Sequence, residues 1–341
     1  MLSLRRNLRK DSGNIMLTGE IISLTVAMSW TITALLAEYA SKKMGSLPHN
    51  LIRMVVSLLM LAAILWLTIG TPYPLMADWH TWFWLGLSGF VGYTLGDYCL
   101  MQSYIVMNSR FGQLFMTLAS PSAAMAAWML LGQTMRPLAV LGMLITMFGI
   151  GMSVLGKGDG ARKLNLKMPM KGILFGIGAA MGQGVGLVLS RVGMDRYQSA
   201  IAAAGITDIS AWSSTEALFP VSFGFIMPFA STMIRCIIGM IGFSAALFLL
   251  SKNGKQKLQK AVGNRRAMWC VWGGAVFGPC VGVSLSLMAT LYTSAGIAQT
   301  IMALTPILIL LPSRFIYHQR ISVLEVVGAI ISVAGVSLFF L

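Results

Sequence analysis

Few residues of this sequence could perform chemistry, and the clearest is Asp97, an acid inside a long apolar segment. The chain has only ten acids and three histidines, compared with 25 lysines and arginines. A carboxylate at such a position is costly to bury and usually serves a function. It could bind a cation or couple a process to a proton. The alternative is a structural acid that is hydrogen-bonded to a neighbouring helix or lies close to the headgroups.

Two arginines, Arg53 and Arg235, lie three or four residues into apolar segments in the two halves of the chain. They could extend to lipid phosphates at the membrane surface. They could instead line the entrances of a cavity and attract an anionic group such as a carboxylate. Because their positions are equivalent in the repeats described below, a shared structural role is the favoured interpretation.

Other polar and aromatic side chains in the apolar segments are candidates for a pathway that a solute or ion could follow. They could surround a zwitterionic solute, or they could form hydrogen bonds between helices, as such groups commonly do in membranes. These candidates are Trp30, Tyr93, Tyr98, Gln102, Gln113, Gln183, Ser284 and Gln299.

The sequence predicts neither a metal site nor a cofactor. Its four cysteines include no CxxC pair, and its three histidines are too far apart for the spacing of a zinc site. No glycine cluster lies between a strand and a helix, so a nucleotide-binding loop is excluded. Any transport by this chain is therefore expected to proceed without ATP hydrolysis.

The elements that must position these residues are membrane-spanning helices. Hydrophobic residues make up 57% of the 341 positions and charged residues only 10%, which excludes an ordinary water-soluble domain and a disordered chain. A helical crossing needs about 20 apolar residues, and lipid-exposed backbone must satisfy its own polar groups. We predict an all-α integral membrane protein with ten transmembrane helices, at about residues 15–37, 50–70, 81–104, 111–132, 137–156, 171–192, 226–250, 269–290, 296–313 and 323–341.

The predicted helices fall into two groups of five. A basic tail at 1–14 precedes the first group at 15–156, and a polar linker at 157–170 leads to the second group at 171–341. The second group contains an insertion at about 195–219, in which a short interfacial helix is one interpretation. We expect the first apolar segment to be a retained helix, because it exceeds the apolar core of a signal peptide.

The two groups repeat one another, and all five pairs of helices agree in order. Because five is odd, the second group must enter the membrane from the opposite side, which gives the inverted repeat of many secondary transporters. The position equivalent to Asp97 holds the apolar Val283. The matching features are Ile52–Val56 with Ile234–Ile238, Gly92 and Gly96 with Gly278 and Gly282, Gly142 and Gly149 with Gly328 and Gly335, and Pro121 with Pro306.

Pro121 and Pro306 are expected to interrupt the fourth and ninth helices. Each lacks a backbone N–H, so each removes a helical hydrogen bond within the membrane. A bend there would suit an element that moves during transport, and a static kink is the alternative.

The matched helix openings, the paired prolines and the last helix of each half, with its two glycines seven residues apart, resemble the EamA family of the drug/metabolite transporter superfamily. The resemblance covers residues 15–341 apart from the insertion. It implies ten helices around a central cavity and the export of small metabolites, often amino acids. The sequence departs from the family at Gln133 and Gln319, where its members usually carry Glu.

The distribution of basic residues and the family resemblance disagree on orientation. Outside the predicted helices, the side that holds the termini carries seven basic residues, four of them in the basic tail, and the opposite side carries sixteen. The positive-inside rule therefore places both termini outside. The resemblance implies that both lie in the cytoplasm. The net charge of +15 is attributed to contacts with lipid headgroups and not to nucleic acid.

These observations predict a multi-pass protein of the cell (inner or plasma) membrane that acts as a secondary transporter. We expect export of a small amphipathic metabolite, such as an amino acid, by alternating access, with proton coupling as a further hypothesis. Two alternatives are a membrane-embedded enzyme that acts on lipid and a membrane scaffold or sensor without transport. The scattered acids and histidines offer little material for an enzyme site. The substrate, the coupling ion, the direction of transport and the oligomeric state remain open.

Overall fold

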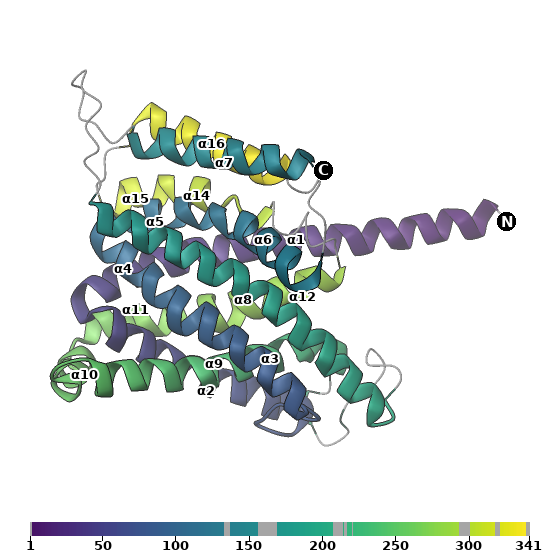
Figure 1. Ribbon diagram of the computed structural model, residues 1–341. Helices are drawn as coiled ribbons and strands as arrows, with labels where there is room; N and C mark the ends of the chain where they lie inside the picture. The colour runs from purple at the N-terminus through teal and green to yellow at the C-terminus, as the bar shows by residue number, and fades with distance from the viewer. Residues whose placement is uncertain are drawn as a thin grey trace.

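The computed structural model describes residues 2–132, 137–155, 169–206, 214, 217–219, 221–292, 301–317 and 321–338, with side chains from Thr18 onward. The described part is helical, and none of its residues forms a β-strand (Figure 1).

The first half of the chain contains nine helical elements. Two long helices are followed by a helix with a π-helical centre, a helix with a 3₁₀ turn, and a final helix. They are α1 (Leu2–Met44), α2 (Ser46–Ile69), α3 (Trp79–Gly89), the π-helix η1 (Phe90–Asp97), α4 (Tyr98–Met107), α5 (Ser109–Phe115), the 3₁₀ turn η2 (Met116–Leu118), α6 (Ala119–Leu131) and α7 (Pro137–Leu155).

The second half has a similar order with one added helix, α10, after the second long helix. Its elements are α8 (Met170–Ala203), α9 (Phe223–Ala245), the π-helix η3 (Ala246–Leu250), α10 (Gly254–Val262), α11 (Arg265–Ala275), the π-helix η4 (Val276–Val283), α12 (Ser284–Tyr292), α14 (Thr305–Leu308), α15 (Leu310–Tyr317) and α16 (Val323–Leu338).

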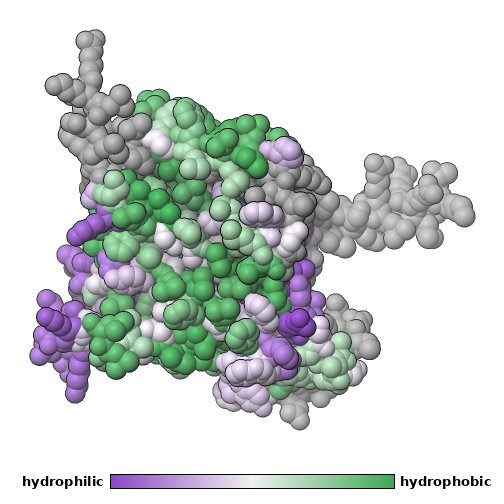
Figure 2. Space-filling view, viewed as in Figure 1, coloured by the Kyte–Doolittle hydropathy of each residue, from purple (hydrophilic) through white to green (hydrophobic). Residues whose placement is uncertain are grey.

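Several helices are suited to cross a membrane. Within the described residues, the spans Thr18–Met44, Ser46–Ile69, Met170–Ala203, Phe223–Leu250 and Arg265–Ala289 are long and apolar enough, and shorter apolar helices accompany them. Large apolar side chains such as Phe148 and Leu249 are exposed on the outer surface. Figure 2 shows an apolar band over the middle of the molecule with hydrophilic residues toward its ends. This surface matches a multi-pass membrane protein.

Two long helices extend beyond the predicted boundaries. Helix α1 begins at Leu2, within the predicted basic tail, and continues to Met44, beyond the predicted end at residue 37; α8 continues through Ala203 into the expected insertion. Polar residues at a helix end do not stop the helix, so hydropathy alone makes the predicted helix too short. The basic stretch after α9 contains a separate amphipathic helix, α10 (Gly254–Val262).

The local structure repeats between the two halves. Helices α3, η1 and α4 begin at residues 79, 90 and 98, and α11, η4 and α12 begin at 265, 276 and 284, the same interval of 186 residues each time. The caps repeat as well: Asp78 accepts a hydrogen bond from the Thr81 N–H, and Asn264 from the Ala267 N–H. Both halves therefore build the same π-interrupted helix.

The two halves also exchange partners in space. Helix α1 packs against α11, η4 and α12, whereas α8 packs against α3, η1 and α4 (Figure 1). Helices α2 and α9 pack against each other at one side of the bundle, and α7 packs along α16 at the opposite side. The first helix of each repeat thus packs against the π-interrupted helix of the other repeat.

Glycines allow the close contact between α7 and α16. A Cβ at Gly149 would lie 2.5 Å from the Ser332 nitrogen, and one at Gly335 would lie 2.5 Å from the Thr146 nitrogen. Thr146 and Ser332, which are also 186 residues apart, donate to each other's backbone oxygens at 3.3 and 3.4 Å. This reciprocal pair is what a two-fold relationship between the repeats would produce.

Replacing Gly149 with Ala is expected to lower the free energy of unfolding by about 1–3 kcal/mol, because the new methyl group meets backbone atoms that cannot yield. Gly151→Ala on the same helix is the matched control, since a Cβ there meets nothing within 4 Å. Equilibrium unfolding in mixed detergent and dodecyl sulfate micelles measures both. Equal stability of the two variants would contradict the packing described.

Candidate functional site

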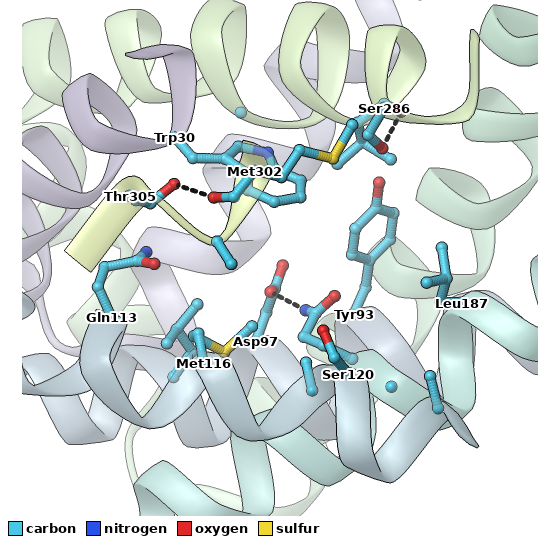
Figure 3. A pocket seen from close by; sticks show the side chains of 18 of the residues that line it. Trp30, Tyr93, Asp97, Gln113, Met116, Ser120, Leu187, Ser286, Met302 and Thr305 are labelled. Carbon is cyan, nitrogen blue, oxygen red and sulfur yellow. Dashed lines mark hydrogen bonds between the residues drawn. The ribbon is translucent and has the colours of Figure 1, made fainter. Parts of the chain in front are cut away.

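A cavity of about 610 Å³ lies between the two halves of the described chain. Both repeats contribute to its walls, which come from α1, α2, η1, α4, α5, η2, α6, α8, α9, η4, α12, α14 and the turn before α14. Of the side chains singled out in the sequence, those that line this cavity are Trp30, Arg53, Tyr93, Asp97, Gln113, Gln183, Arg235 and Pro306 (Figure 3).

Asp97 is held at the cavity wall by contacts from two other helices. One carboxylate oxygen, Oδ2, pairs with the guanidinium of Arg53 on α2. The other, Oδ1, accepts a hydrogen bond of 2.7 Å from the Gln183 amide on α8. The Asp97 side chain is 7% exposed and that of Arg53 is 4% exposed. The acid is therefore buried as one member of an ion pair.

The π-helical geometry of η1 explains how these partners reach Asp97. A π-turn leaves backbone carbonyl groups without their usual helical donors. The Gln183 amide donates to the Gly92 backbone oxygen at 3.1 Å, and the Asn50 amide donates to the Asp97 backbone oxygen at 3.3 Å. Gln183 thus bonds both the backbone of the widened helix and the Asp97 carboxylate.

Arg235 on α9 lies beside this pair without an acidic partner of its own among the described residues. Its guanidinium stacks over the Tyr93 ring with the carbon 4.8 Å from the ring centre. The Arg235 residue is 4% exposed, and its Nε has no hydrogen-bond partner in the described part of the chain. Burial of both Arg53 and Arg235 contradicts the interpretation that they extend to lipid phosphates.

Glycines on α3 and η1 make room for Arg235. A Cβ at Gly89 would lie 2.5 Å from the Arg235 carbonyl oxygen, and one at Gly92 would lie 3.1 Å from its Nη2. The small residues therefore let α9 approach closely enough to present the guanidinium to the cavity.

The remaining wall is mainly apolar. Methionine and aliphatic side chains from both halves cover it, which leaves the charged groups concentrated near Asp97. These apolar residues include Met101, Met116, Leu187, Val188, Val283, Leu287 and Met302.

Three of the predicted pathway residues point elsewhere. Gln102 donates to the Ser46 hydroxyl at 3.0 Å and to the Tyr98 hydroxyl at 3.2 Å, and the Tyr98 ring packs edge-on against Phe175. Ser284 donates to Thr232 on α9 at 3.2 Å. These side chains join helices instead of lining the cavity. The residues of the same helices that do line the cavity, such as Asp97, Leu100 and Met101, are three or four positions apart, so Tyr98 and Gln102 fall on a different face of the helix.

Three sequence candidates lie outside the described residues, namely Gln299, Gln133 and Gln319. The helices are irregular just before both prolines. Pro121 follows the 3₁₀ turn η2 within the continuous helical run Ser109–Leu131. Pro306 is the second residue of α14 and follows turn residues at 303–304. A proline removes the hydrogen bond to the carbonyl four residues earlier, which fits the irregular turn at each place.

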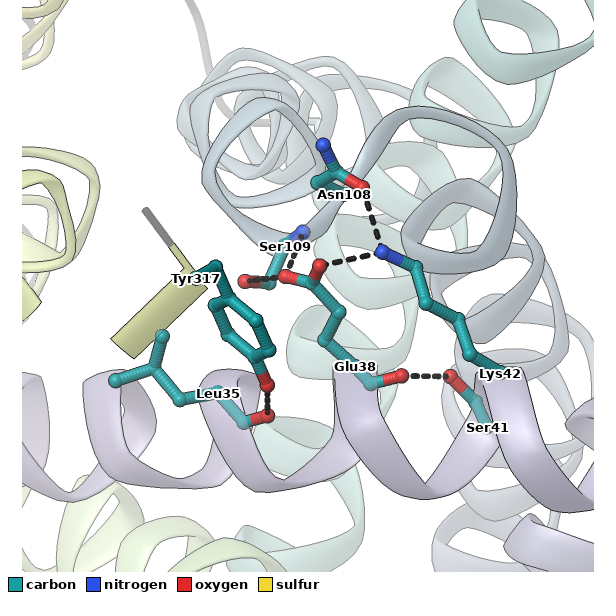
Figure 4. A network of polar contacts seen from close by, with 7 residues as sticks. All are labelled: Leu35, Glu38, Ser41, Lys42, Asn108, Ser109 and Tyr317. Carbon is teal, nitrogen blue, oxygen red and sulfur yellow. Dashed lines mark hydrogen bonds and ion pairs between the residues drawn. The ribbon is translucent and has the colours of Figure 1, made fainter. Parts of the chain in front are cut away.

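A second polar cluster, centred on Glu38, was not expected from the sequence (Figure 4). The Glu38 carboxylate pairs with Lys42 at 2.5 Å and accepts hydrogen bonds from the Ser109 N–H at 2.8 Å and hydroxyl at 2.5 Å. Lys42 also donates to Asn108, whose φ of 73° forms the sharp turn between α4 and α5. Glu38 follows directly after the apolar run that ends at residue 37, and hydropathy alone assigns a residue in that position to a loop.

Contacts between the repeats adjoin this cluster. The Tyr317 hydroxyl on α15 donates to the Leu35 oxygen at 2.7 Å, and Arg110 on α5 pairs with Glu325 on α16 at 3.1 Å. Glu325 also caps its own helix with Ser322, the role that its place in a first turn favours. These bonds close one end of the bundle.

The described residues contain no group of three or more His, Cys, Asp and Glu side chains able to hold a metal. The site is instead a mixed surface of three guanidiniums, one carboxylate, amides and apolar groups around a space large enough for a small organic molecule.

Comparisons with known proteins agree with this architecture. The model of the EamA-like transporter family matches residues 17–155 and again residues 200–341. No curated protein matches the chain. A solved structure described as "Crystal structure of protein" shares the fold, with a TM-score of 0.59 and 15% identity over 95% of this chain and 96% of that one. Two copies of one family model span most of the sequence, and the chain therefore belongs to the EamA-like transporter family.

Proposed function

We propose that this membrane protein is a secondary transporter that exports a small amphipathic metabolite, such as an amino acid, across the cell membrane by alternating access. In this proposal ten spanning segments form two inverted repeats of five. The observation that carries it is the cavity between the repeats, with Asp97, Arg53 and Gln183 of three different helices joined at its wall. Repeats of opposite orientation can exchange conformations around such a fixed site.

The asymmetry of the two ends of the cavity supports alternating access. At one end, Glu38, Ser109 and the Tyr317–Leu35 bond tie α1 to α5 and α15. At the other end the wall includes Arg191, whose side chain is 55% exposed. In this proposal the conformation described is closed toward Glu38 and open toward Arg191, and transport reverses the two.

Transport is tested with purified protein in liposomes, using a panel of radiolabelled amino acids and an imposed pH gradient without ATP. The proposal expects accumulation of at least one compound above protein-free liposomes and exchange of the internal label for unlabelled compound. A lack of both uptake and exchange across the panel would count against it.

We further propose that Asp97 couples transport to protons, because it is the one acid on the cavity wall among the described residues. Replacing Asp97 with Asn is expected to abolish the dependence of the transport rate on pH, since the amide cannot release a proton at physiological pH. The measurement is the initial rate per folded protein from pH 5.5 to 8. Glu20→Gln serves as the control, because Glu20 does not line the cavity. An unchanged pH profile in Asp97→Asn removes this residue from coupling.

A further inference from the structure

We propose that the cavity selects a solute of net negative charge, a small amphipathic carboxylic acid whose carboxylate pairs with Arg235. This inference rests on the proposed transport function and replaces the amino acid given there as an example by an organic acid without an ammonium group. Three features support it: the charge balance of the cavity, the repeat, and two unpartnered polar groups.

The charges on the cavity wall do not cancel. Three arginines line it, and Arg191 pairs with Asp195 at 3.3 Å on the exposed surface of α8. Arg53 pairs with Asp97. Arg235 interacts electrostatically with Asp97 but forms no ion pair with a described acid, so two buried guanidiniums share one carboxylate. A buried cation without an anionic partner is costly, and a bound anion would remove that cost.

The repeat shows where the missing acid would be. Arg53 and Arg235 occupy equivalent positions on α2 and α9, and Asp97 and Val283 are the last residues of η1 and η4. Both Asp97 and Val283 line the cavity. The first repeat thus supplies the carboxylate for its own arginine, whereas the second repeat has an apolar side chain at the equivalent position. A carboxylate from the solute would complete the second half of the pattern.

Polar groups that face the same space lack partners. The Tyr93 hydroxyl is buried and has no hydrogen-bond partner among the described residues, and the same is true of the Arg235 Nε. Figure 3 shows the Tyr93 hydroxyl directed into the cavity, toward Ser286 and away from Asp97. A hydroxyl and a guanidinium are both donors to a carboxylate, and Arg can bind one with two parallel hydrogen bonds.

The rest of the solute must be apolar. Met116, Leu187 and Met302 line the cavity together with the arginines, and methionine adapts to varied apolar shapes. An ammonium group would find no free acid there, because both Asp97 oxygens are occupied by Arg53 and Gln183. The site therefore favours an organic acid over a zwitterion or an amine.

Four probes with the same phenylethyl body separate charge from shape: 3-phenylpropionate, phenylalanine, 2-phenylethylamine and 3-phenylpropionamide. Their dissociation constants for the purified full chain in detergent are measured by isothermal titration calorimetry. We expect 3-phenylpropionate to bind at least about tenfold more tightly than each of the other three. Equal or tighter binding of phenylalanine, of the amine or of the amide overturns the inference, as does a lack of measurable binding by 3-phenylpropionate.

Val283→Asp provides the sharpest variant, because it supplies the second repeat with its own acid. It is expected to weaken binding of 3-phenylpropionate at least about tenfold relative to Val283→Asn, which has nearly the same volume and no charge. Arg235→Gln is expected to weaken it similarly, with partial recovery in Arg235→Lys. Equal affinity of the Asp and Asn variants contradicts the proposed role of Arg235.

The two levels of the proposal fail differently. If liposomes transport phenylalanine but 3-phenylpropionate neither binds nor competes, the choice of an anion is wrong and the transporter function stands. If 3-phenylpropionate binds with the expected dependence on Arg235 but neither it nor the amino acid panel crosses the membrane, the anion site stands and the transport function is wrong.

Discussion

Replacing Arg53 with Gln is expected to lower the free energy of unfolding by about 3–5 kcal/mol, the usual cost of leaving one member of a buried ion pair without the other. Asp97 would keep its hydrogen bond from Gln183 but lose the only cation bonded to it in the described structure. Equilibrium unfolding in mixed detergent and dodecyl sulfate micelles measures the loss.

The double variant Arg53→Gln/Asp97→Asn is the control for this result. Two neutral amides of similar size can hydrogen-bond to each other, so the double variant should regain most of the stability that Arg53→Gln loses. The difference between the double variant and the sum of the two single variants gives the coupling energy. Simple additivity of the two single effects would show that the pair is not coupled.

Replacing Glu38 with Ala is expected to cost about 2–4 kcal/mol, because the Ser109 N–H and hydroxyl then lose their acceptor inside the bundle. Lys42 would keep only Asn108 as a partner. The closed end of the cavity should also loosen, which the rate of amide hydrogen exchange at the turn between α4 and α5 measures.

Glu20→Ala is the matched control on the same helix. Glu20 is partly exposed and makes no hydrogen bond or ion pair with another described residue, so its replacement should change the stability by less than about 0.5 kcal/mol. If Glu38→Ala proved no more destabilising than Glu20→Ala, the cluster around Glu38 would have no structural role.

The sequence was informative wherever one residue carried the signal. Asp97 stood out as an acid in an apolar run, and the structure places it on the cavity wall. The equivalence of Arg53 and Arg235 followed from the repeat, and both line the same cavity. The paired glycines of the last helices marked the repeat, and in the structure Gly149 and Gly335 lie at the interface of α7 with α16.

The sequence was uninformative wherever the signal depends on two helices together. The pairing of Arg53 with Asp97 joins residues 44 positions apart on different helices, which no local pattern encodes. The π-helical segments were not foreseen either. Tyr98 and Ser284 lie on helix faces that contact other helices, and single-residue reasoning could not tell these faces from the cavity face. Glu38 was missed because the apolar run ends at residue 37, whereas helix α1 continues to Met44 and carries Glu38 into the bundle.

The central claim is that the two repeats are inverted, and the side of the membrane reached by equivalent residues tests it most directly. His80 and Arg266 are exposed in the first turns of α3 and α11 and are 186 residues apart. Each is replaced by Cys in a background without Cys99, Cys236, Cys270 and Cys280, and intact cells are treated with a membrane-impermeant maleimide. The account predicts that one of the two cysteines reacts from outside and the other only after permeabilisation. Reaction of both from the same side would contradict it.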